Sequence, residues 1–357
     1  MAKTRIKLAV LGGSGYTGGE LLRLLAHHPY ADVRIVTGDK AVGSPVASHF
    51  PNLEKFFPLV FEPMDLQRIT KAADLVFMAL PHTKSIEPVA HCMKANKHVI
   101  DLSADYRLTD QNLYEQWYGI THSSPHLLRR SVYGLPELHR SSIARAQLVA
   151  VPGCYPTAAI LQLAPLLAKG LVKKDSIVID AKSGVSGAGR SPALAYHFPE
   201  VHESITAYKI GQHRHTPEIE QELTKIVTRY NKGRKSSFAV IFTPHLTPMN
   251  RGILSTAYAK MSKPMTTEAL QRLYHQFYRN ERFIRIRKES IHVSPNQVRG
   301  SNFCDISVCA DKRTGNIITV SALDNLVKGA AGQAIQAMNL MMGYSEDTGL
   351  NAPGMFP

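Results

Sequence analysis

The stretch IKLAVLGGSGYTGGELLRLLA, residues 6–26, decides the fold of the first part of the chain. Its apolar start, Ile6 to Leu11, predicts a short buried strand, and leucines at helical spacing predict a helix over Gly15 to Ala26. A β-branched run from Asp32 to Thr37 predicts the next strand. Together these segments form a βαβ unit, which is the building block of a parallel sheet.

Gly12, Gly15 and Gly18 stand in a GxxGxxG spacing between that strand and that helix. Glycines let the backbone turn tightly and approach a pyrophosphate, whose charge is met by free N–H groups and by the positive end of the helix dipole. The same glycines would also suit a tight strand-to-helix turn that binds nothing. The position directly after a strand and at the opening of a helix favours a dinucleotide site.

The end of the second strand bears on the choice of cofactor. NAD-preferring sites usually carry an acidic residue there to hold the ribose hydroxyls, whereas this chain reads Val36-Thr37-Gly38-Asp39-Lys40. Thr37 takes the strand end, and Lys40 is placed to reach a 2′-phosphate. We therefore expect NADP(H), with Asp39 leaving NAD as the alternative.

The rest of the chain predicts an α/β protein of two parts. Before Pro152, further strands at Leu75–Leu80, Val99–Leu102 and Leu148–Val151, with a helix over Ser85–Ala95, extend a Rossmann-like parallel sheet. After it, an α+β catalytic domain with a largely antiparallel sheet is predicted from strands at 176–180, 238–243, 253–260, 302–310 and 317–323 and helices at 157–168, 217–230 and 267–280. We place the cofactor domain at 1–153, a catalytic and oligomerisation domain at 154–324, and at 325–357 a C-terminal helix that returns to the cofactor domain.

Composition limits the class of protein. The 357 residues are 44% hydrophobic, and no run approaches the roughly 18 apolar residues of a membrane span. Forty-two Lys and Arg against 28 Asp and Glu give a net charge of +14, which favours anionic partners. The basic groups at 129–130, 173–174, 232–235 and 282–288 are dispersed, so we expect a small anionic substrate, no nucleic acid and no membrane. A nucleic-acid-binding regulator that senses NADP is the alternative from another class.

Cysteine usage indicates a reducing compartment, and we expect the cytoplasm. The four cysteines lack CxxC spacing, so no metal site is expected. Cys154 lies in VAVPGCYPTAAI, between a strand and a predicted helix start, where the helix dipole stabilises a thiolate. A rigid loop of glycine and prolines presents it, which favours a nucleophile over the small buried filler that we expect at Cys92, Cys304 and Cys309.

The segment GQHRHTPE supplies the imidazole that a thiolate nucleophile needs. His213 and His215 flank Arg214 just before a helix that Pro217 suits as a first residue. Metal ligation by the HxH pair is the alternative, but no third clustered ligand follows from the sequence.

Eight motifs in chain order resemble the N-acetyl-gamma-glutamyl-phosphate reductases of arginine biosynthesis. They are GGSGYTGGELLRLL, ALPH, DLSADYR, YGLPEL, VPGCYPTAA, KSGVSGAGR, HRHTPEI and NLVKGAAGQAIQAMN, and they cover the chain from about residue 8 to residue 340. The resemblance implies a fold and a mechanism similar to those of aspartate-semialdehyde dehydrogenase and glyceraldehyde-phosphate dehydrogenase. It also implies release of inorganic phosphate and a homo-oligomer, either a dimer or a tetramer.

The resemblance also implies roles for single residues. Cys154 becomes the nucleophile that forms a thioester, and His213 the acid/base, although the sequence leaves His215 open for that task. The residues expected to contact substrate are Arg107 (at the acyl phosphate), Arg190, Arg214 and His215. The residues expected to contact the cofactor are Gly12, Ser14, Gly15, Tyr16, Thr17, Gly18, Thr37, Lys40, Ser183, Gly184, Asn325 and Gly329.

Two positions depart from the family pattern. Thr83 follows Pro81-His82 where a glycine is usual, and His139 stands in PELHR where an asparagine is usual. Both bear on local loop shape. A sister reductase of another acyl phosphate, aspartyl or aminoadipyl, is the nearest alternative function, and the HRHTPE and GCYPT matches favour the acetylglutamyl substrate.

Overall fold

The computed structural model describes residues 4–230, 238–288 and 292–357; the basic segment 232–235 therefore lies outside the described residues. The described chain folds as two compact units. Unit 1 is Met1–Gly153 with Ala330–Ala352, and unit 2 is Cys154–Gly329 with Pro353–Pro357. These limits differ from the predicted last boundary at 324/325. The backbone N–H of Gly329 donates to the carbonyl of Asp324 at 2.9 Å, and that of Met355 to the carbonyl of Arg299 at 2.8 Å, so both segments belong to unit 2.

In the described part of unit 1, a seven-stranded sheet has the order β3-β2-β1-β4-β5-β7-β6. All its pairings are parallel. The strands are β1 (Ile6–Leu11), β2 (Ala31–Thr37), β3 (Phe61–Glu62), β4 (Leu75–Met78), β5 (His98–Asp101), β6 (Val132–Tyr133) and β7 (Leu148–Ala150). The predicted Rossmann-like sheet is confirmed. Chain order reverses beside β1, which is where such sheets bind ligands.

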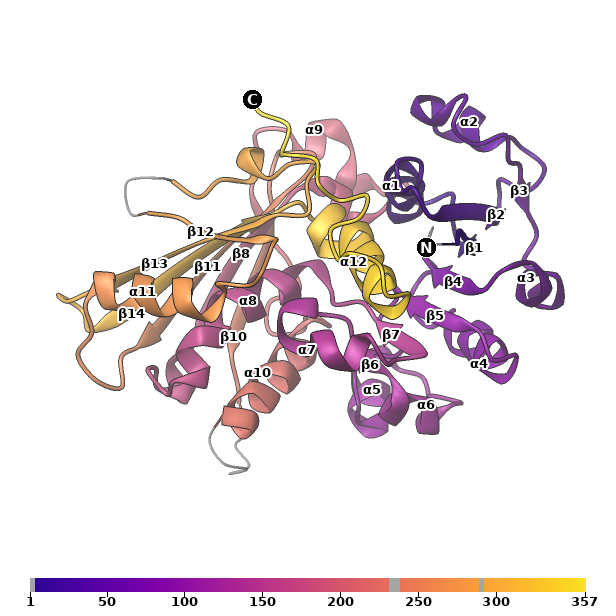
Figure 1. Ribbon diagram of the computed structural model, residues 1–357. Coiled ribbons are helices and arrows are strands. Elements are labelled where there is room, and N and C mark those ends of the chain that lie inside the picture. The colour runs from indigo at the N-terminus through magenta and orange to yellow at the C-terminus, as the bar shows by residue number, and fades with distance from the viewer. Residues whose placement is uncertain (1–3, 231–237, 289–291) are drawn as a thin grey trace. The chain divides into compact units, whose positions relative to one another are not determined.

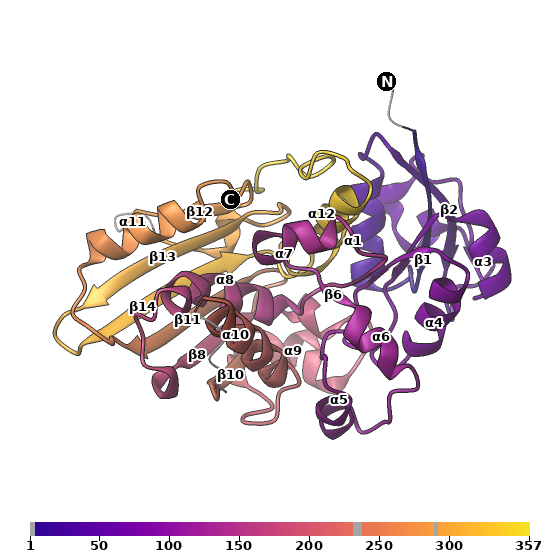
Figure 2. The same cartoon turned by 60° about the horizontal axis from the view of Figure 1, so that its bottom comes forward.

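Helices cover both faces of this sheet, as Figure 2 shows: α1 and α12 lie on one side of β1 and β2, and α3 and α4 on the other. The helices of unit 1 are α1 (Tyr16–Leu25), α2 (Val46–His49), α3 (Leu66–Ala72), α4 (Ile86–Lys94), α5 (Gln111–Tyr118), α6 (Pro125–Arg130), α7 (Pro136–Ile143) and α12 (Gly332–Met341). The C-terminal α12 contacts α1 and α7, far from it in sequence. Sequence periodicity did not predict α2, α3, α5, α6 and α7 because each spans only four to eight residues.

In the described part of unit 2, a seven-stranded mixed sheet has the order β12-β13-β14-β11-β8-β10-β9. Its central pairings are antiparallel, whereas β10 runs parallel to β8 and β12 parallel to β13. The strands are β8 (Val178–Ser183), β9 (Thr206–Ala207), β10 (Ile241–Leu246), β11 (Ile253–Lys260), β12 (Ile284–Ile286), β13 (Cys304–Asp311) and β14 (Asn316–Leu323). Helices α8 (Cys154–Ala168), α10 (Thr216–Tyr230) and α11 (Thr267–Phe277) pack on one side, and α9 (Phe198–Val201) is short (Figure 1).

Helix α8 is the core helix of unit 2. Every residue after Cys154 is buried, because the helix is apolar on all sides. It starts three residues before the predicted position. Pro165 within it has no N–H, which leaves the carbonyl of Leu161 without its intrahelical donor, and the Tyr278 hydroxyl of the segment after α11 donates to that carbonyl instead.

None of the described helices that pack on this sheet covers its other face. Along β11, buried Ile253, Ser255, Ala257 and Ala259 alternate with residues that are half-buried or exposed, among them Leu254 and Tyr258. Opposite Tyr258 on the neighbouring strands are Ile318 and Val178, and Ile241 lies beyond Val178. Monomeric proteins rarely expose such a contiguous apolar area. We refer to this surface, with Val178, Ile241, Leu254, Tyr258 and Ile318 at its centre, as the open face.

The described residues also bear on membrane insertion and metal binding. None of the helices in the described segments is long and apolar enough to cross a bilayer. Within those same segments, no three His, Cys, Asp or Glu side chains are grouped so that they could hold a metal ion.

Candidate active site

Steric constraints require glycine at two positions of the turn after β1. Gly12 has φ of +77°, and a Cβ there would stand 2.4 Å from the carbonyl oxygen of Ala79. A Cβ on Gly18 would stand 2.5 Å from the Cα of Gly13. Contacts this close cannot exist, so both positions require glycine whether or not a ligand binds. The turn is thus fixed by its own backbone.

Gly15 is different, and this difference points to a ligand. A Cβ there would meet only the carbonyl oxygen of Gly12, at an ordinary 3.9 Å. Gly15 is the N-cap of α1, whose first turn reads Tyr-Thr-Gly-Gly and is uncharged. The space beside Gly15 at the helix N-terminus is therefore open; we call this space the cradle, and it would admit a bound pyrophosphate. Of the predicted neighbours, Ser14 and Thr17 are half-buried, and Tyr16 is exposed.

Thr37 and Lys40 take different places at the end of β2. Thr37 is buried, and its hydroxyl oxygen accepts a hydrogen bond from the backbone N–H of Gly12 at 3.0 Å. Its carbonyl accepts the N–H of Gly13 at 2.8 Å. Thr37 therefore ties the glycine turn to β2. Asp39 and Lys40 follow the strand and are exposed, so they stay the candidates for reading the ribose.

Cys154 opens α8 and is half-buried. It directly follows the loop Val151-Pro152-Gly153, which leads from β7 into α8. The 15 residues of α8 point the positive end of their dipole at this position, and that end stabilises a thiolate. A Cβ on Gly329 would come within 2.8 Å of the Cys154 Cβ, so the glycine at 329 keeps space beside the thiol. By contrast, burial raises the pKa of the Cys92 thiol to about 12, which makes it unreactive.

An aromatic group surrounds the histidines. The Tyr155 ring meets those of His213 and His215 with centroids 5.7 and 6.0 Å apart, and Tyr208 meets His213 at 5.5 Å. The Tyr208 hydroxyl donates to that of Tyr155 at 3.3 Å, which donates to the carbonyl of His245 at 3.1 Å. We call Cys154, Tyr155, Tyr208, His213 and His215 the Cys–His cluster. Burial raises the pKa of Tyr208 to about 12, so both tyrosines are neutral hydroxyl donors.

His213 is the most confined member of the Cys–His cluster. It is 8% exposed, and its Nδ1 accepts the backbone N–H of His215 at 3.1 Å. Burial, followed by the charges of Lys209 and Arg214, lowers its pKa to about 4. Lys209 was not singled out from the sequence. It is exposed and has φ of +47°, an uncommon backbone conformation for a residue with a Cβ.

The predicted arginines fall into two sets. Arg214 lies beside the histidines and is exposed, as is Arg190, which follows the loop after β8. Arg107 is buried: its Nε donates to the carbonyl of Val151 at 2.8 Å and its Nη2 to that of Leu102 at 3.0 Å. The guanidinium therefore joins the chain after β5 to the chain after β7, three residues before Cys154. Its contact with an acyl phosphate stays a prediction.

Two buried carboxylates near Arg107 were missed by sequence analysis. Asp101 accepts hydrogen bonds from the N–H and the hydroxyl of Ser103, while burial, and then the charge of Asp105, raises its pKa to about 7. Asp105 accepts the backbone N–H groups of Thr83 and Ser85 at 2.7 and 2.9 Å. The motif DLSADYR thus builds the loops after β4 and β5. The two aspartates four positions apart within this motif were the available signal.

Three residues that were predicted to contact the cofactor hold loops of unit 2 together. Asn325 is 2% exposed; its Oδ1 accepts the N–H of Gly252 at 2.7 Å, and its Nδ2 donates to the hydroxyl of Ser186 at 3.0 Å. The buried Ser183 hydroxyl donates to the carbonyl of Gly184 at 3.0 Å. A Cβ on Gly184 would stand 2.6 Å from the carbonyl oxygen of Asn250. These residues shape the loop after β8, and direct contact with a nicotinamide stays a prediction.

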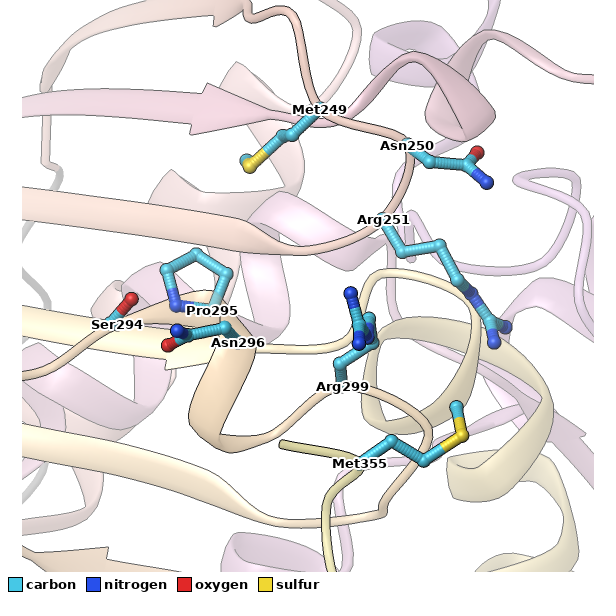
Figure 3. A pocket seen from close by; sticks show the side chains of 8 residues that line it. All are labelled: Met249, Asn250, Arg251, Ser294, Pro295, Asn296, Arg299 and Met355. Carbon is cyan, nitrogen blue, oxygen red and sulfur yellow. The ribbon is translucent and has the colours of Figure 1, made fainter. Parts of the chain in front are cut away.

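A cavity of about 540 Å³ lies in unit 2 beside the 249–252 loop (Figure 3). Its lining residues are Met249, Asn250, Arg251, Ser294, Pro295, Asn296, Arg299 and Met355. Arg251 pairs with the buried Asp324 at 3.5 Å, and the Arg299 Nη2 donates to the carbonyl of Pro357. Both guanidinium groups are thus engaged within the chain.

The two departures from the family pattern lie at irregular positions of the backbone. Thr83 has φ of +71°, a left-handed conformation that favours glycine. His139 has φ of −130° and ψ of 18° and interrupts α7 with a kink, where its ring meets that of Tyr133. The effect of the two changes on loop shape stays a prediction.

Comparison with known proteins bears on the family. The family described as "Semialdehyde dehydrogenase, NAD binding domain" matches residues 7–146, and "Semialdehyde dehydrogenase, dimerisation domain" matches residues 154–325. An N-acetyl-gamma-glutamyl-phosphate reductase of Geotalea daltonii is 51% identical over 99% of this chain and 100% of its own length. One of Pelotomaculum thermopropionicum is 47% identical over 99% of each chain.

The chain belongs to the N-acetyl-gamma-glutamyl-phosphate reductase family. The resemblance inferred from the eight motifs is therefore confirmed. The fold agrees: aspartate semialdehyde dehydrogenase II of Vibrio cholerae has a TM-score of 0.71 at 15% identity, covering 96% of this chain and 99% of that one. The Candida albicans enzyme, solved with NADP, has a TM-score of 0.70 at 15% identity, covering 95% and 98%.

Proposed function

We propose that the protein reduces N-acetyl-L-glutamyl 5-phosphate to N-acetyl-L-glutamate 5-semialdehyde with NADPH and releases inorganic phosphate, a step of arginine biosynthesis. Membership of the reductase family supports this reaction. The observation that carries the chemistry is the position of Cys154 at the N-terminus of the 15-residue helix α8, with Tyr155 in contact with both histidines.

Cys154 acts as the nucleophile. Its thiolate attacks the acyl carbon, forms the C–S bond of a thioester and expels phosphate. The α8 dipole favours the thiolate, and Gly329 keeps the space beside the sulfur open for the acyl group. Splitting the reduction in this way gives each step a good leaving group.

The glycine turn with Gly15 at its open cradle would hold the cofactor pyrophosphate, and Lys40 would meet a 2′-phosphate. When bound, the nicotinamide cofactor supplies the hydride that reduces the thioester. Thr37 contributes by fixing the turn through the N–H of Gly12.

The substrate carries a phosphate and a carboxylate, and the exposed cations near the site match them. Lys209 and Arg214 lie beside His213, and Arg190 follows the loop after β8. Arginine binds planar anions with two parallel hydrogen bonds, which suits a carboxylate or a phosphate. We assign Arg107 a role in positioning Cys154, because its Nε donates to the carbonyl of Val151, three residues before the cysteine.

We further propose that the active form is a homo-oligomer, a dimer or a tetramer, assembled through the open face. The match to a dimerisation domain over residues 154–325 supports association. The apolar side chains of the open face, Tyr258 and Ile241 among them, are 42% and 63% exposed in the single chain. Burying them in a symmetric interface would remove that area from water.

The reaction is tested in reverse with N-acetyl-glutamate semialdehyde and NADP, with and without inorganic phosphate. Strict dependence of NADPH formation on phosphate is expected, since phosphate must release the acyl group from Cys154. Turnover that continues in its absence would indicate a hydrolytic aldehyde dehydrogenase. Aspartate semialdehyde in place of the acetylated substrate tests the sister reaction, for which we expect a much lower kcat/KM.

A further inference from the structure

Glycines bring the walls of the cavity in unit 2 into close contact. The residues that line it belong to three segments: 249–252, 294–299 and 353–357. Gly252 has φ of +117°, and a Cβ there would stand 2.5 Å from the Cβ of Pro295. A Cβ on Gly354 would stand 2.5 Å from the carbonyl oxygen of Gln297. Larger residues cannot occupy these two contacts, so the cavity is a built part of the fold.

The side chains that line this cavity suit an anion with an apolar body. Among the described residues, its lining holds two arginines, two asparagines and a serine, which can all donate hydrogen bonds, and no acidic residue. The other three lining residues, Met249, Pro295 and Met355, are apolar. Figure 3 shows Arg251 and Arg299 reaching the cavity from different segments. We refer to it as the arginine cavity.

The two arginines differ in how their charges are balanced. Arg251 pairs with the buried Asp324 at 3.5 Å, so these two charges offset each other. Within the described segments, Arg299 forms no ion pair with a carboxylate side chain, and its guanidinium makes one hydrogen bond, from Nη2 to the carbonyl of Pro357. Most of its N–H donors are therefore available to an oxyanion, which a guanidinium can bind with two parallel hydrogen bonds.

The segment 353–357 leaves the arginine cavity accessible. The backbone N–H of Met355 donates to the carbonyl of Arg299 at 2.8 Å, which places this segment beside the guanidinium. Met355 and Phe356 are nevertheless 54% and 69% exposed. The segment buries little apolar surface of its own, so small shifts that admit a ligand cost little free energy.

One wall of the arginine cavity is bonded to the loop after β8. The carbonyl of Asn250 accepts both the N–H and the hydroxyl of Ser186, at 3.1 and 2.7 Å. The carbonyl of Met249 accepts the N–H of Val185 at 2.9 Å. A ligand in the cavity would therefore contact the two residues whose backbone holds this loop.

We propose that the arginine cavity is a binding site for a small oxyanion that carries an apolar body, such as an organic phosphate. Arg299 binds the oxyanion, and Met249, Pro295 and Met355 contact the body. None of the lining residues belongs to the glycine turn or to the Cys–His cluster. The site is thus separate from the residues of the proposed reaction, and the inference does not rest on that reaction.

Phenyl phosphate is the probe, because it joins an oxyanion to an apolar ring. In the full chain labelled with ¹³C-methyl methionine, Met249→Leu and Met355→Leu identify the two methyl signals of the cavity. We expect both signals to shift saturably, with a Kd of about 1 mM or below. Absent or unsaturable shifts would reject the site. Inorganic phosphate should bind more weakly, and equal affinity for it would overturn the part assigned to the apolar residues.

Arg299→Gln should raise the Kd for phenyl phosphate by about tenfold or more, because a charge-assisted hydrogen bond is lost. Arg313→Gln is the matched control: it removes the same charge from an exposed side chain outside the cavity and should change the Kd by less than about twofold. An equal rise in both variants would indicate general attraction to a basic surface and overturn the proposal.

A second variant covers the case in which Arg299→Gln does not fold. Asn296 is exposed, and Asn296→Asp adds a carboxylate to the cavity without a change of size. Repulsion of the probe should raise the Kd by about fivefold or more. An unchanged Kd in this variant would show that phenyl phosphate binds elsewhere.

Discussion

The glycine turn of unit 1 and the Cys–His cluster of unit 2 are held in their local structures by opposite means. The turn works through the absence of side chains: at Gly12 and Gly18 a single carbon would collide with backbone, and at Gly15 there is room for a ligand. The cluster works through side chains that hold one another, such as Tyr208 on Tyr155 and the His215 backbone on His213. The turn should therefore fail when an atom is added, and the cluster when an atom is exchanged.

The largest expected effect comes from exchanging one atom of the cluster. Cys154→Ser should lower reduction by 10⁴-fold or more, on the order of other lost nucleophiles, because the hydroxyl is a far weaker nucleophile and leaving group. NADPH binding should stay measurable by fluorescence titration. Cys309→Ser, on β13, is the control and should retain activity. Turnover by Cys154→Ser would disprove the thioester.

Adding one carbon at two places in the turn separates folding from binding. Gly18→Ala meets the Gly13 backbone at 2.5 Å and should destabilise the protein by about 2 kcal/mol, while weakening NADPH binding. Gly15→Ala meets nothing closer than 3.9 Å, so its stability should change by less than about 0.5 kcal/mol. Its Kd for NADPH should nevertheless rise, by about tenfold or more. Urea unfolding and titration of both variants test this, and unchanged affinity in Gly15→Ala would remove the cradle from the cofactor site.

The cluster should also leave a signature in the acid stability of the protein. The pKa of His213 lies at about 4 in the folded chain and near 6.5 when unfolded. Between these values the unfolded state binds a proton that the folded state does not, so stability falls as pH drops from 6.5 toward 4.

The matched variant for this effect is His213→Asn, which does not titrate. Between pH 7.5 and pH 4.5 the wild type should lose about 2 kcal/mol more unfolding free energy than His213→Asn, measured by urea denaturation. Parallel losses in the two proteins would show that His213 is protonated in the folded state as readily as in the unfolded one.

The smallest expected effect tests the backbone rule outside the turn. Thr83 has φ of +71°, and its N–H donates to the Asp105 carboxylate. Thr83→Gly should stabilise the protein by about 0.5–1 kcal/mol, because relief of the left-handed strain exceeds the entropy that glycine adds to the unfolded chain. Thr83→Ala keeps a Cβ and should gain less. A rise in Tm of equal size in both variants would assign the effect to the loss of the Thr side chain instead.

The same contrast explains what could be predicted from the sequence. The glycine turn was found at the right residues because its requirements are local: strand, glycines and helix follow one another within 20 positions. Five strands of unit 2 were placed to within about three residues, and β11 at its observed limits, whereas β9 and β12, of two and three residues, were not predicted. Short helices such as α5 and α7 were missed because fewer than three turns do not establish a period.

Contacts between distant residues account for the rest. Nothing in the local sequence indicates that Tyr208 would donate to Tyr155, or that Asn325 would hold the loop after β8. Thr37 was predicted to contact the cofactor because it ends a strand. In the structure its hydroxyl accepts the N–H of Gly12, a contact that the sequence did not indicate, and contact with the cofactor stays a prediction. Arg107 shows the same limit, since the carbonyls that it meets are set by the order of β5 and β7 in the sheet.

The turn after β14 holds three loops that lie far from it in sequence. Asp324 accepts the backbone N–H of Gly300, 24 positions earlier, and Asn325 reaches Gly252 and Ser186, which are 73 and 139 positions earlier. Contacts between such distant positions form late in folding, because the chain loses the conformational entropy of each large loop before the new hydrogen bond stabilises it. During synthesis Ser186 and Gly252 leave the ribosome long before Asn325 does, so the loops that contain them can take their final form only after residue 325 has emerged.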